Sequence, residues 1–275
     1  TVLFSIDPEN GYIDPNNQQN IPGLDALNDA DLMIVATRFR TPSEESMKPF
    51  DAFLEAGKPV IGLRTATHGF RGKWSFFGLQ ILGEKWVAHH GGHKREGCRG
   101  VVEAANAKHP VLNSVKDVFA PSDVYTVRNL DEKKATVLLR GAVTATLDPA
   151  SKAIDGPKNN PLQALAWLRE YTAPGGTKGH AFCTTMGASV DLVSHDARRI
   201  VVNAAYHLTG LEVPKAANVD FVDPFYPSFY GFVRDKQFWV DRNLKPHDFS
   251  LGKSPLAKDP SGTPDWPFRK MGPAK

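Results

Sequence analysis

An α/β fold, with an open parallel sheet and helices on both of its faces, is predicted by three features of the sequence. Short apolar runs alternate with amphipathic segments between Asp7 and Gly210. The runs are continuously apolar, which is typical of parallel strands that are buried on both sides. Hydrophobic residues make up 41% of the 275 residues, so the chain can bury a large core without disulfides.

The first part of the chain supplies three predicted strands and two predicted helices. Residues 1–6 (TVLFSI), 32–37 (LMIVAT) and 59–63 (PVIGL) are short, β-prone apolar runs that predict strands. Residues 42–56 have helical spacing, and residues 76–82 suggest a second, short helix. The longer helix has Ser43 as a possible N-cap, Gly57 as a stop, and an apolar face of Met47, Phe50, Phe53 and Leu54.

The later part of the α/β region supplies further strands and one long helix. The predicted strands are residues 124–127, 136–139, 165–171 and 178–185. Residues 197–209 form a strongly amphipathic helix, and its first turn holds two arginines that must find acids or solvent because the helix dipole disfavours cations there. The face predicted to pack on the sheet is Ile200, Val201, Ala204, Ala205 and Leu208.

The chain divides into an α/β domain of residues 1–212 and an extended arm of residues 213–275. The arm is rich in proline, which breaks helices and strand ladders, and in aromatic residues, which are scarce in disordered tails. We therefore expect an ordered arm that lies on its own domain or on a second subunit, and a homo-oligomer or other assembly formed through it. A flexible tail is the alternative.

Composition excludes several classes of protein. The net charge of +3 arises from scattered charges and does not favour nucleic acid, and no apolar stretch of ~18 residues predicts a membrane span. Cys98 lies in a basic segment and Cys183 in a predicted core strand, so neither resembles a nucleophile. The two could form a disulfide in an exported protein. Export to the periplasm is slightly favoured over a cytoplasmic location, and both remain open.

Ligands of open α/β sheets bind beyond the carboxyl ends of the strands, which directs attention to the loop after the strand at 59–63. Arg64 could hold a carboxylate or a sugar hydroxyl with its planar fork. His68 could act as a general acid or base, and Thr65 lies between them as a possible substrate contact. Alternatively, Arg64 pairs with a local acid and His68 caps a turn.

Three histidines follow closely in the segment HHGGH. His89, His90 and His93 could converge on a substrate or a divalent metal, because Gly91 and Gly92 allow a tight backbone. A metal site would need a carboxylate or a fourth ligand from elsewhere. Alternatively, one or two of these histidines hydrogen-bond the loop. No motif in the sequence requires a cofactor.

Two further loops contain candidate ligand-binding residues. Arg38 and Arg40 flank a phenylalanine, and could bind an anionic or polyhydroxyl ligand or pair with acids such as Glu44 and Glu45. Ser189 and Asp191 follow the predicted strand at 178–185 and could serve a site or cap the next helix.

The order of several motifs resembles the bacterial trehalose-utilisation (ThuA-like) family, from about residue 3 to residue 211. The motifs are DADLMIVATRFR, EAGKPVIGLRTATHGF, LGEKWVAHHGGH, KHPVL, SDVYTV and CTTMGASVDL, followed by ARRIVVNAAYHLTGL. The resemblance implies a flavodoxin-like fold of the class I glutamine-amidotransferase type and a link to carbohydrate use. It also implies an earlier strand and helix, so we expect the first strand–helix unit to be missing from this chain.

The chain departs from the pattern of these relatives at two places. The amidotransferases carry a nucleophilic cysteine in the turn after the third strand, where this chain has Arg64 and Thr65. A cysteine-dependent glutaminase is therefore excluded. Other ThuA-like proteins carry histidine where this chain has Arg64 and near Ala188, and both departures remove possible metal ligands.

The resulting hypothesis is an enzyme that modifies a sugar or keto-sugar derivative by acid/base chemistry, as a hydrolase, lyase or isomerase. His68 would be the acid or base, Arg64 and Arg38 would orient the substrate, and Asp191 would orient a neighbour. His68, Arg64 and at least one histidine of residues 89–93 should then face a common cavity. The alternative is a non-catalytic ligand-binding or assembly module of the same fold.

Overall fold

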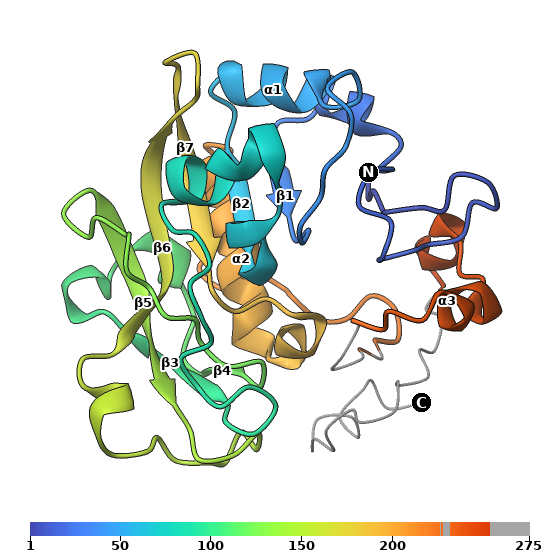
Figure 1. Cartoon of the computed structure of the whole chain (residues 1–275). Helices are drawn as coiled ribbons and strands as arrows, with labels where there is room; N and C mark the ends of the chain where they lie inside the picture. Colours follow the sequence, from blue (N-terminus) through green and yellow to red (C-terminus); the bar gives the residue numbers. More distant parts are fainter. Residues whose placement is uncertain (226, 228–231, 254–275) are drawn as a thin grey trace.

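The computed structural model describes residues 1–225, 227 and 232–253, and its centre is a seven-stranded mixed sheet (Figure 1). The order of the strands across the sheet is β1-β2-β7-β6-β5-β3-β4. The α/β class is confirmed. The strands are β1 (Met33–Val35), β2 (Val60–Leu63), β3 (Cys98–Val102), β4 (Val118–Ala120), β5 (Ala135–Val143), β6 (Gln163–Thr172) and β7 (Lys178–Thr184).

Parallel pairing is confined to β1, β2 and β7, whereas β6, β5, β3 and β4 join the sheet antiparallel. The sheet therefore differs from the wholly parallel one that was expected. The physical reason is the length of the connections: only residues 173–177 separate β6 from β7, and so short a link can join only antiparallel neighbours.

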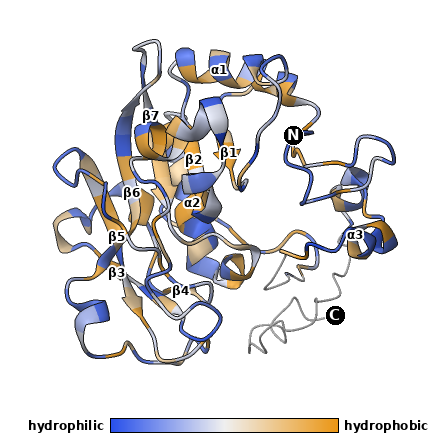
Figure 2. Cartoon of the chain, in the orientation of Figure 1, coloured by the Kyte–Doolittle hydropathy of each residue, from blue (hydrophilic) through white to orange (hydrophobic). Residues whose placement is uncertain are grey.

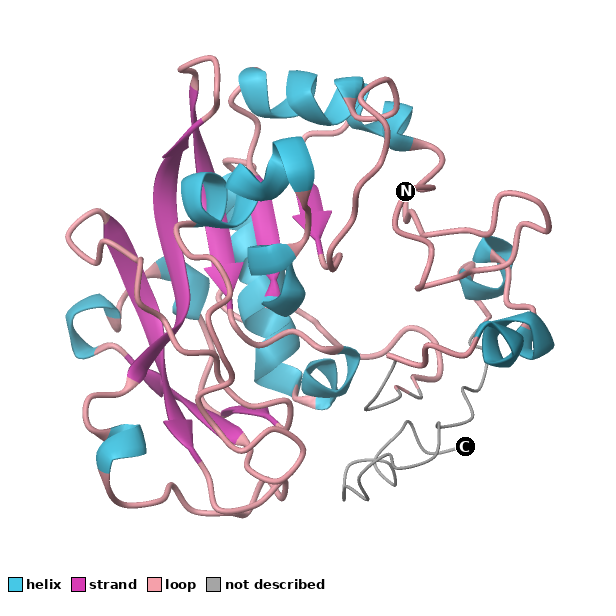
Figure 3. Cartoon of the chain, viewed as in Figure 1, coloured by secondary structure: helices cyan, strands magenta, loops and turns pink. Residues whose placement is uncertain are grey.

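Helices cover both faces of the sheet, as predicted (Figure 3). Helix α1 (Lys48–Glu55) and the π-helical turn η4 (Phe77–Leu82) pack on one face. Helix α2 (His195–Leu208) packs on the other. The remaining helices are α3 (Lys236–Arg242) and the 3₁₀ turns η1 (Leu24–Asn28), η2 (Arg64–His68), η3 (Gly72–Ser75), η5 (Ala104–Asn106), η6 (Pro110–Leu112), η7 (Pro157–Asn159), η8 (Ser189–Val193) and η9 (Pro246–Phe249).

Hydrophobic residues are concentrated in the strands and on the inner sides of the helices, as Figure 2 shows. In α2, Ala197, Ile200 and Ala204 are buried in the core beneath the sheet. Val201, Ala205 and Leu208 pack against the same core and are partly buried, which confirms the predicted face. In the described part of the chain, no helix is both long and apolar enough to cross a membrane.

The two arginines at the start of α2 find partners, as predicted. Arg199 forms an ion pair with Asp196 on the preceding turn. Arg198 donates hydrogen bonds to the carbonyl oxygens of Leu192, Val193 and Val219. Carbonyl oxygens and one acid thus offset the unfavourable position of these cations in the first helical turns.

Several predicted elements are wrong, because an apolar run forms a strand only where another strand pairs with its backbone. Residues 1–6 form no strand, and their only ladder contact is a bridge between Ile6 and Ile13. Residues 124–127 also form no strand, apart from a bridge from Tyr125 to His89. The first helix begins at Lys48 rather than at residue 42, since Ser43 accepts a hydrogen bond from Ser46 in a preceding turn. The pattern missed β3, β4 and α3.

The segment after α2 packs on its own chain. Ala217 and Val219 are buried, and the guanidinium of Arg198 lies 3.8 Å from the ring centre of Phe221. Farther on, α3 lies beside the N-terminal segment (Figure 1), where Ile13 donates a hydrogen bond to the Leu244 carbonyl. Tyr226, Phe229 and Tyr230 of the aromatic stretch lie outside the described residues. The division at residue 212 and the homo-oligomer stay predictions.

Both cysteines are free and buried. Cys98 belongs to the core on the α2 side of the sheet, and Cys183 belongs to the core on the α1 side. Burial raises the pKa of both thiols, so neither is a thiolate at neutral pH. The disulfide considered from the sequence is therefore not formed, and neither residue is an activated nucleophile.

Candidate functional site

The site begins where β2 ends and η2 starts. Arg64, the first residue of η2, adopts a left-handed conformation with φ 41° and is buried. Its guanidinium donates hydrogen bonds to the carbonyl oxygens of Asp123 and Thr185 at 3.1 and 3.0 Å, and to that of Ser122. Arg64 thus ties the end of β2 to two neighbouring loops. Of the two alternatives for this residue, the structure supports pairing within the chain.

Asp123 is the centre of a group that we call the His–Asp cluster (His89, His93 and Asp123). Its Oδ2 atom lies 3.0 Å from Nδ1 of both His89 and His93, and its Oδ1 atom lies 3.4 Å from Nη2 of Arg64. The side chain of Asp123 is fully buried, whereas that of His89 is 34% exposed. The two imidazole rings stack with their centres 4.1 Å apart. One carboxylate therefore holds two nearly parallel imidazoles by the same ring nitrogen.

The backbone brings this cluster together through one close approach and one special turn. A Cβ atom on Gly91 would lie 3.1 Å from the Cβ of Asp123, so glycine lets the histidine loop come close. Asp123 itself has φ 71°, a left-handed conformation that aspartate tolerates better than most residues. Asp191 fixes the adjacent turn, since its carboxylate accepts hydrogen bonds from the backbone N–H and hydroxyl of Ser122.

The protonation of the cluster follows from the charge of Asp123. Burial acts to raise the pKa of Asp123, but hydrogen bonds from His89 and His93 and the charge of Arg64 outweigh it, and the net pKa is lowered. An ionised carboxylate can only accept hydrogen bonds. Nδ1 of each imidazole must therefore carry the proton, and Nε2 of a neutral ring keeps a lone pair.

His68 lies beside the cluster, within a group of aromatic rings. Its ring centre is 5.0 Å from that of Phe39, 5.3 Å from that of Trp86 and 6.1 Å from that of Tyr125. The rings of Trp86 and Tyr125 also contact His89, at 6.0 and 5.4 Å. His68 and His89 therefore share two aromatic neighbours, and Arg64 lies over the ring of Tyr125 at 4.4 Å.

His68 is neutral at physiological pH. Burial, together with the positive charges of Arg38 and Arg64, lowers the pKa of His68 to about 3. A neutral imidazole can donate or accept a hydrogen bond, but one with so low a pKa is a weak proton acceptor. Burial likewise raises the pKa of Tyr125 to about 12, so its phenol stays protonated.

The low pKa of His68 predicts a pH dependence of stability. Between pH 6.5 and about 3 the unfolded chain binds a proton at this residue and the folded chain does not, so stability falls on acidification through that window. Between pH 7 and pH 5, we expect the free energy of unfolding to fall by about 1–2 kcal/mol more in the wild type than in His68→Gln. Urea unfolding at both pH values measures this, with the exposed His180→Gln as control. Equal losses in wild type and His68→Gln would contradict the assignment.

The His–Asp cluster could also hold a metal ion. The potential ligand atoms of His89, His93 and Asp123 all lie within 4.8 Å of one another, and three protein ligands are usual in catalytic zinc sites. The carboxylate that the histidine segment needed is thus supplied by Asp123. However, the guanidinium of Arg64 already compensates the charge of this carboxylate, which weakens its attraction for a cation.

The other predicted site residues are dispersed. His90 turns away from the cluster, and its Nε2 lies 2.7 Å from the carbonyl oxygen of Lys158. Thr65 donates a hydrogen bond to the Ala36 carbonyl, and Ser189 is exposed at the start of η8. Asp191 is fully buried, and its carboxylate accepts hydrogen bonds from Ser122 and from the backbone N–H groups of Gly187 and Ala188, so it orients a neighbouring turn. Arg38 and Arg40 line a separate pocket, described below.

The sequence did not single out Asp123, Trp86 and Tyr125. Asp123 and Tyr125 belong to the segment SDVYTV, and Trp86 belongs to LGEKWVAHHGGH. Both segments carry the family resemblance, which could have indicated them. Their chemistry was hidden because residues 124–127 resembled a core strand, and because an acid 30 residues after a histidine has no recognisable spacing.

Known proteins resemble this chain in sequence pattern and in fold. A family model described as "Trehalose utilisation" (ThuA) matches residues 14–207. A search of curated proteins gave no match. Among solved structures, a ThuA-like protein from Bacteroides uniformis is similar, with 14% sequence identity and a TM-score of 0.44, over 71% of this chain and 74% of that chain.

Proposed function

Because the chain belongs to the trehalose-utilisation (ThuA) family, we propose that it is an enzyme that modifies a sugar or keto-sugar by acid/base chemistry at the His–Asp cluster. The observation that carries this proposal is the buried Asp123 carboxylate, which lies within hydrogen-bond distance of two partly exposed imidazoles. A carboxylate that orients an imidazole is a recurring arrangement for moving a proton.

His89 is the proposed general base. Asp123 fixes the proton on Nδ1 of His89, so the lone pair of Nε2 is left to take a proton from a substrate hydroxyl or from a carbon beside a carbonyl. The negative charge of Asp123 then stabilises the imidazolium that forms. In the reverse transfer, the protonated Nε2 of His89 returns its proton to the substrate. His93 is held by Asp123 in the same way and stacks on the ring of His89.

His68 takes a different role in this proposal from the one expected from the sequence. With a pKa of about 3, the ring is not an imidazolium at neutral pH, so it does not act as a general acid. As a neutral ring it would donate or accept a hydrogen bond at a substrate oxygen, as neutral histidines do in other isomerases. Arg64 is occupied by Asp123 and backbone carbonyls, so it would position the base rather than bind substrate.

The aromatic rings next to the cluster suit a sugar. Trp86 is 37% exposed although it contacts both His68 and His89. An exposed indole with a polar group on each side offers an apolar platform for the C–H face of a sugar ring, while the imidazoles reach its hydroxyls. The alternative function, a ligand-binding module without turnover, would use the same platform.

Turnover by the purified protein tests the proposal. We expect a panel of keto-sugars and glycosides to contain a substrate, and we expect His89→Gln to lower kcat by about 10²–10⁴-fold, which is the usual contribution of a general base. The matched control is His180→Gln, which changes an exposed histidine on β7. Dialysis against a chelator should leave kcat unchanged, since this mechanism routes no step through a metal.

Three outcomes would count against the proposal. Binding of sugars without turnover would support the non-catalytic module. A loss of turnover on chelation that zinc restores would assign the His–Asp cluster to metal binding. An equal loss of kcat in His89→Gln and His180→Gln would show that the substitutions act through stability, which melting temperatures of both variants would also reveal.

A further inference from the structure

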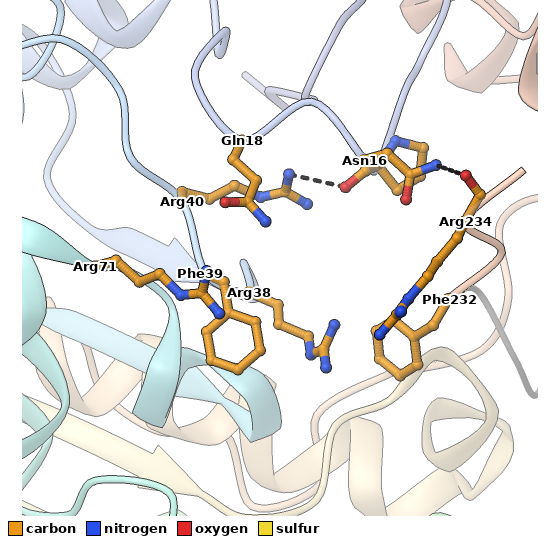
Figure 4. Close-up of a pocket in the computed structure, with 9 residues that line it drawn as sticks. Asn16, Gln18, Arg38, Phe39, Arg40, Arg71, Phe232 and Arg234 are labelled. Carbon is orange, nitrogen blue, oxygen red and sulfur yellow. Dashed lines mark hydrogen bonds between the residues drawn. The ribbon is translucent and has the colours of Figure 1, made fainter. Parts of the chain in front are cut away.

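A second, strongly basic pocket lies next to the His–Asp cluster. Its volume is about 500 Å³, and four of the nine described residues that line it are arginines. They come from three separate parts of the chain, and Figure 4 shows their side chains around a common space. We call this the arginine pocket, and its lining residues are Pro15, Asn16, Gln18, Arg38, Phe39, Arg40, Arg71, Phe232 and Arg234.

The two acids considered as partners of Arg38 and Arg40 pair with lysines instead. Glu44 pairs with Lys73, and Glu45 pairs with Lys48, so the pairing considered from the sequence does not occur. Among the described residues, no aspartate or glutamate lines the pocket. Asp14 favours the charged form of Arg40 from outside the lining. The described walls of the pocket therefore concentrate positive charge and contribute no carboxylate to it.

Arg40 is a buried cation whose hydrogen-bonding capacity is only partly used. The residue is buried, and it donates hydrogen bonds to the carbonyl oxygens of Pro15 and Asn17 at 2.9 and 2.5 Å. Its Nε has no hydrogen-bond partner in the described part of the chain. Burial and the nearby charge of Arg38 both lower the pKa of Arg40. An anion in the pocket would relieve this repulsion.

Two phenylalanine rings hold Arg38 and Arg71 in place. The guanidinium of Arg38 lies 4.4 Å from the ring centre of Phe39 and 4.3 Å from that of Phe232. The guanidinium of Arg71 lies 4.2 Å from the Phe39 ring. Stacking on an aromatic ring fixes the plane of a guanidinium. This is the geometry that binds phosphate and carboxylate groups with two parallel hydrogen bonds.

The arginine pocket is joined to the proposed catalytic site through one ring. Phe39 lines the pocket, and its ring centre lies 5.0 Å from that of His68. Arg38 also lines the pocket and is one of the charges that lower the pKa of His68. A ligand could therefore place an anionic group among the arginines and its sugar ring beside His68 and Trp86.

We propose that the arginine pocket binds the oxyanion of an anionic sugar, a phosphate or a carboxylate, and so selects charged over neutral substrates for the adjacent site. This inference rests on the proposed function for its sugar portion and on the pocket alone for its anion. The arm completes the site, because Phe232 and Arg234 are supplied by the segment that follows the α/β region.

Calorimetry with inorganic phosphate tests the anion site without any assumption about catalysis. At constant ionic strength, the full chain should bind phosphate saturably with one site per chain. Arg71→Gln and Arg234→Gln should each raise the dissociation constant for phosphate about ten-fold, because each variant loses one charge-assisted hydrogen bond to the anion. The control is Lys73→Gln, which removes an equal charge from an exposed side chain outside the lining and should change the constant little. Equal weakening by all three variants, or no saturable binding, would overturn the proposal.

Competition then identifies the anion. Glucose 6-phosphate or glucuronate should bind more tightly than glucose, and the advantage should disappear in Arg71→Gln. The charged sugar that binds more tightly shows whether the pocket prefers a phosphate or a carboxylate. If glucose binds as tightly as both charged sugars, the pocket does not select charged sugars and the proposal is overturned. Phosphate binding without turnover of any sugar would leave the pocket standing and reject the proposed function. If the wild type turns over a sugar, His89→Gln loses that turnover, and the wild type binds no phosphate, the proposed function stands and the anion site is rejected.

Discussion

Asp123→Asn is expected to lower kcat by about 10²–10⁴-fold while the chain still folds. Asparagine preserves the shape of the side chain and tolerates the φ of 71° at this position. Its amide, however, carries a donor where the carboxylate offers only acceptors. The amide would donate to Nδ1 of His89 or His93, and this would move the proton of that ring to Nε2. Steady-state kinetics with the best substrate of the sugar panel measures the loss.

Asp123→Ala should in addition destabilise the fold, because it removes the carboxylate that pairs with the buried guanidinium of Arg64. Removing one member of a buried ion pair costs about 3–5 kcal/mol, which corresponds to a fall in melting temperature of roughly 6–20 °C. The matched control is Asp117→Ala, which breaks an ion pair between Arg99 and a side chain that is 67% exposed, and should cost less than about 1 kcal/mol. Similar melting temperatures for Asp123→Ala and Asp117→Ala would show that Asp123 has no electrostatic role in the fold.

The second large effect is expected at Ile200, on the buried face of α2. Ile200 has no exposed surface and belongs to the core between α2 and the sheet, with Ile61 and Phe182. Ile200→Asp would bury a charge without a partner, and we expect it to prevent stable folding. Ile200→Ala only removes apolar volume and should cost about 2–5 kcal/mol.

The control for Ile200 lies on the opposite face of the same helix. Tyr206 is 36% exposed, so Tyr206→Asp should change the free energy of unfolding by less than about 1 kcal/mol. Urea unfolding followed by circular dichroism compares the three variants. A stability of Ile200→Ala equal to that of Tyr206→Asp would mean that this face of α2 does not carry the core.

The sequence by itself predicted those elements whose buried residues form a recognisable local pattern of apolar residues. Strands β1 and β2 are continuously apolar, β7 has a buried run at its end, and α1 and α2 each carry one apolar face. Periodicity therefore found all five, although it began α1 six residues too early. The same argument failed for residues 1–6, which are as apolar as a strand but have no long partner to pair with. It also missed β3, whose run CRGVV is buried only in part, and whose place depends on pairing with β4 and β5.

The candidate site shows the same division. The sequence identified His68, Arg64, His89 and His93, because these residue types are uncommon and stand in short loops after apolar runs. Only the tertiary structure decided that Asp123 joins them, that His90 turns away, and that the guanidinium of Arg64 contacts Asp123. Likewise, Arg71 and Arg234 meet at one pocket although more than half of the chain separates them. Contacts of this kind depend on sheet order and loop paths, and these are fixed by pairing between distant segments, which no local pattern records.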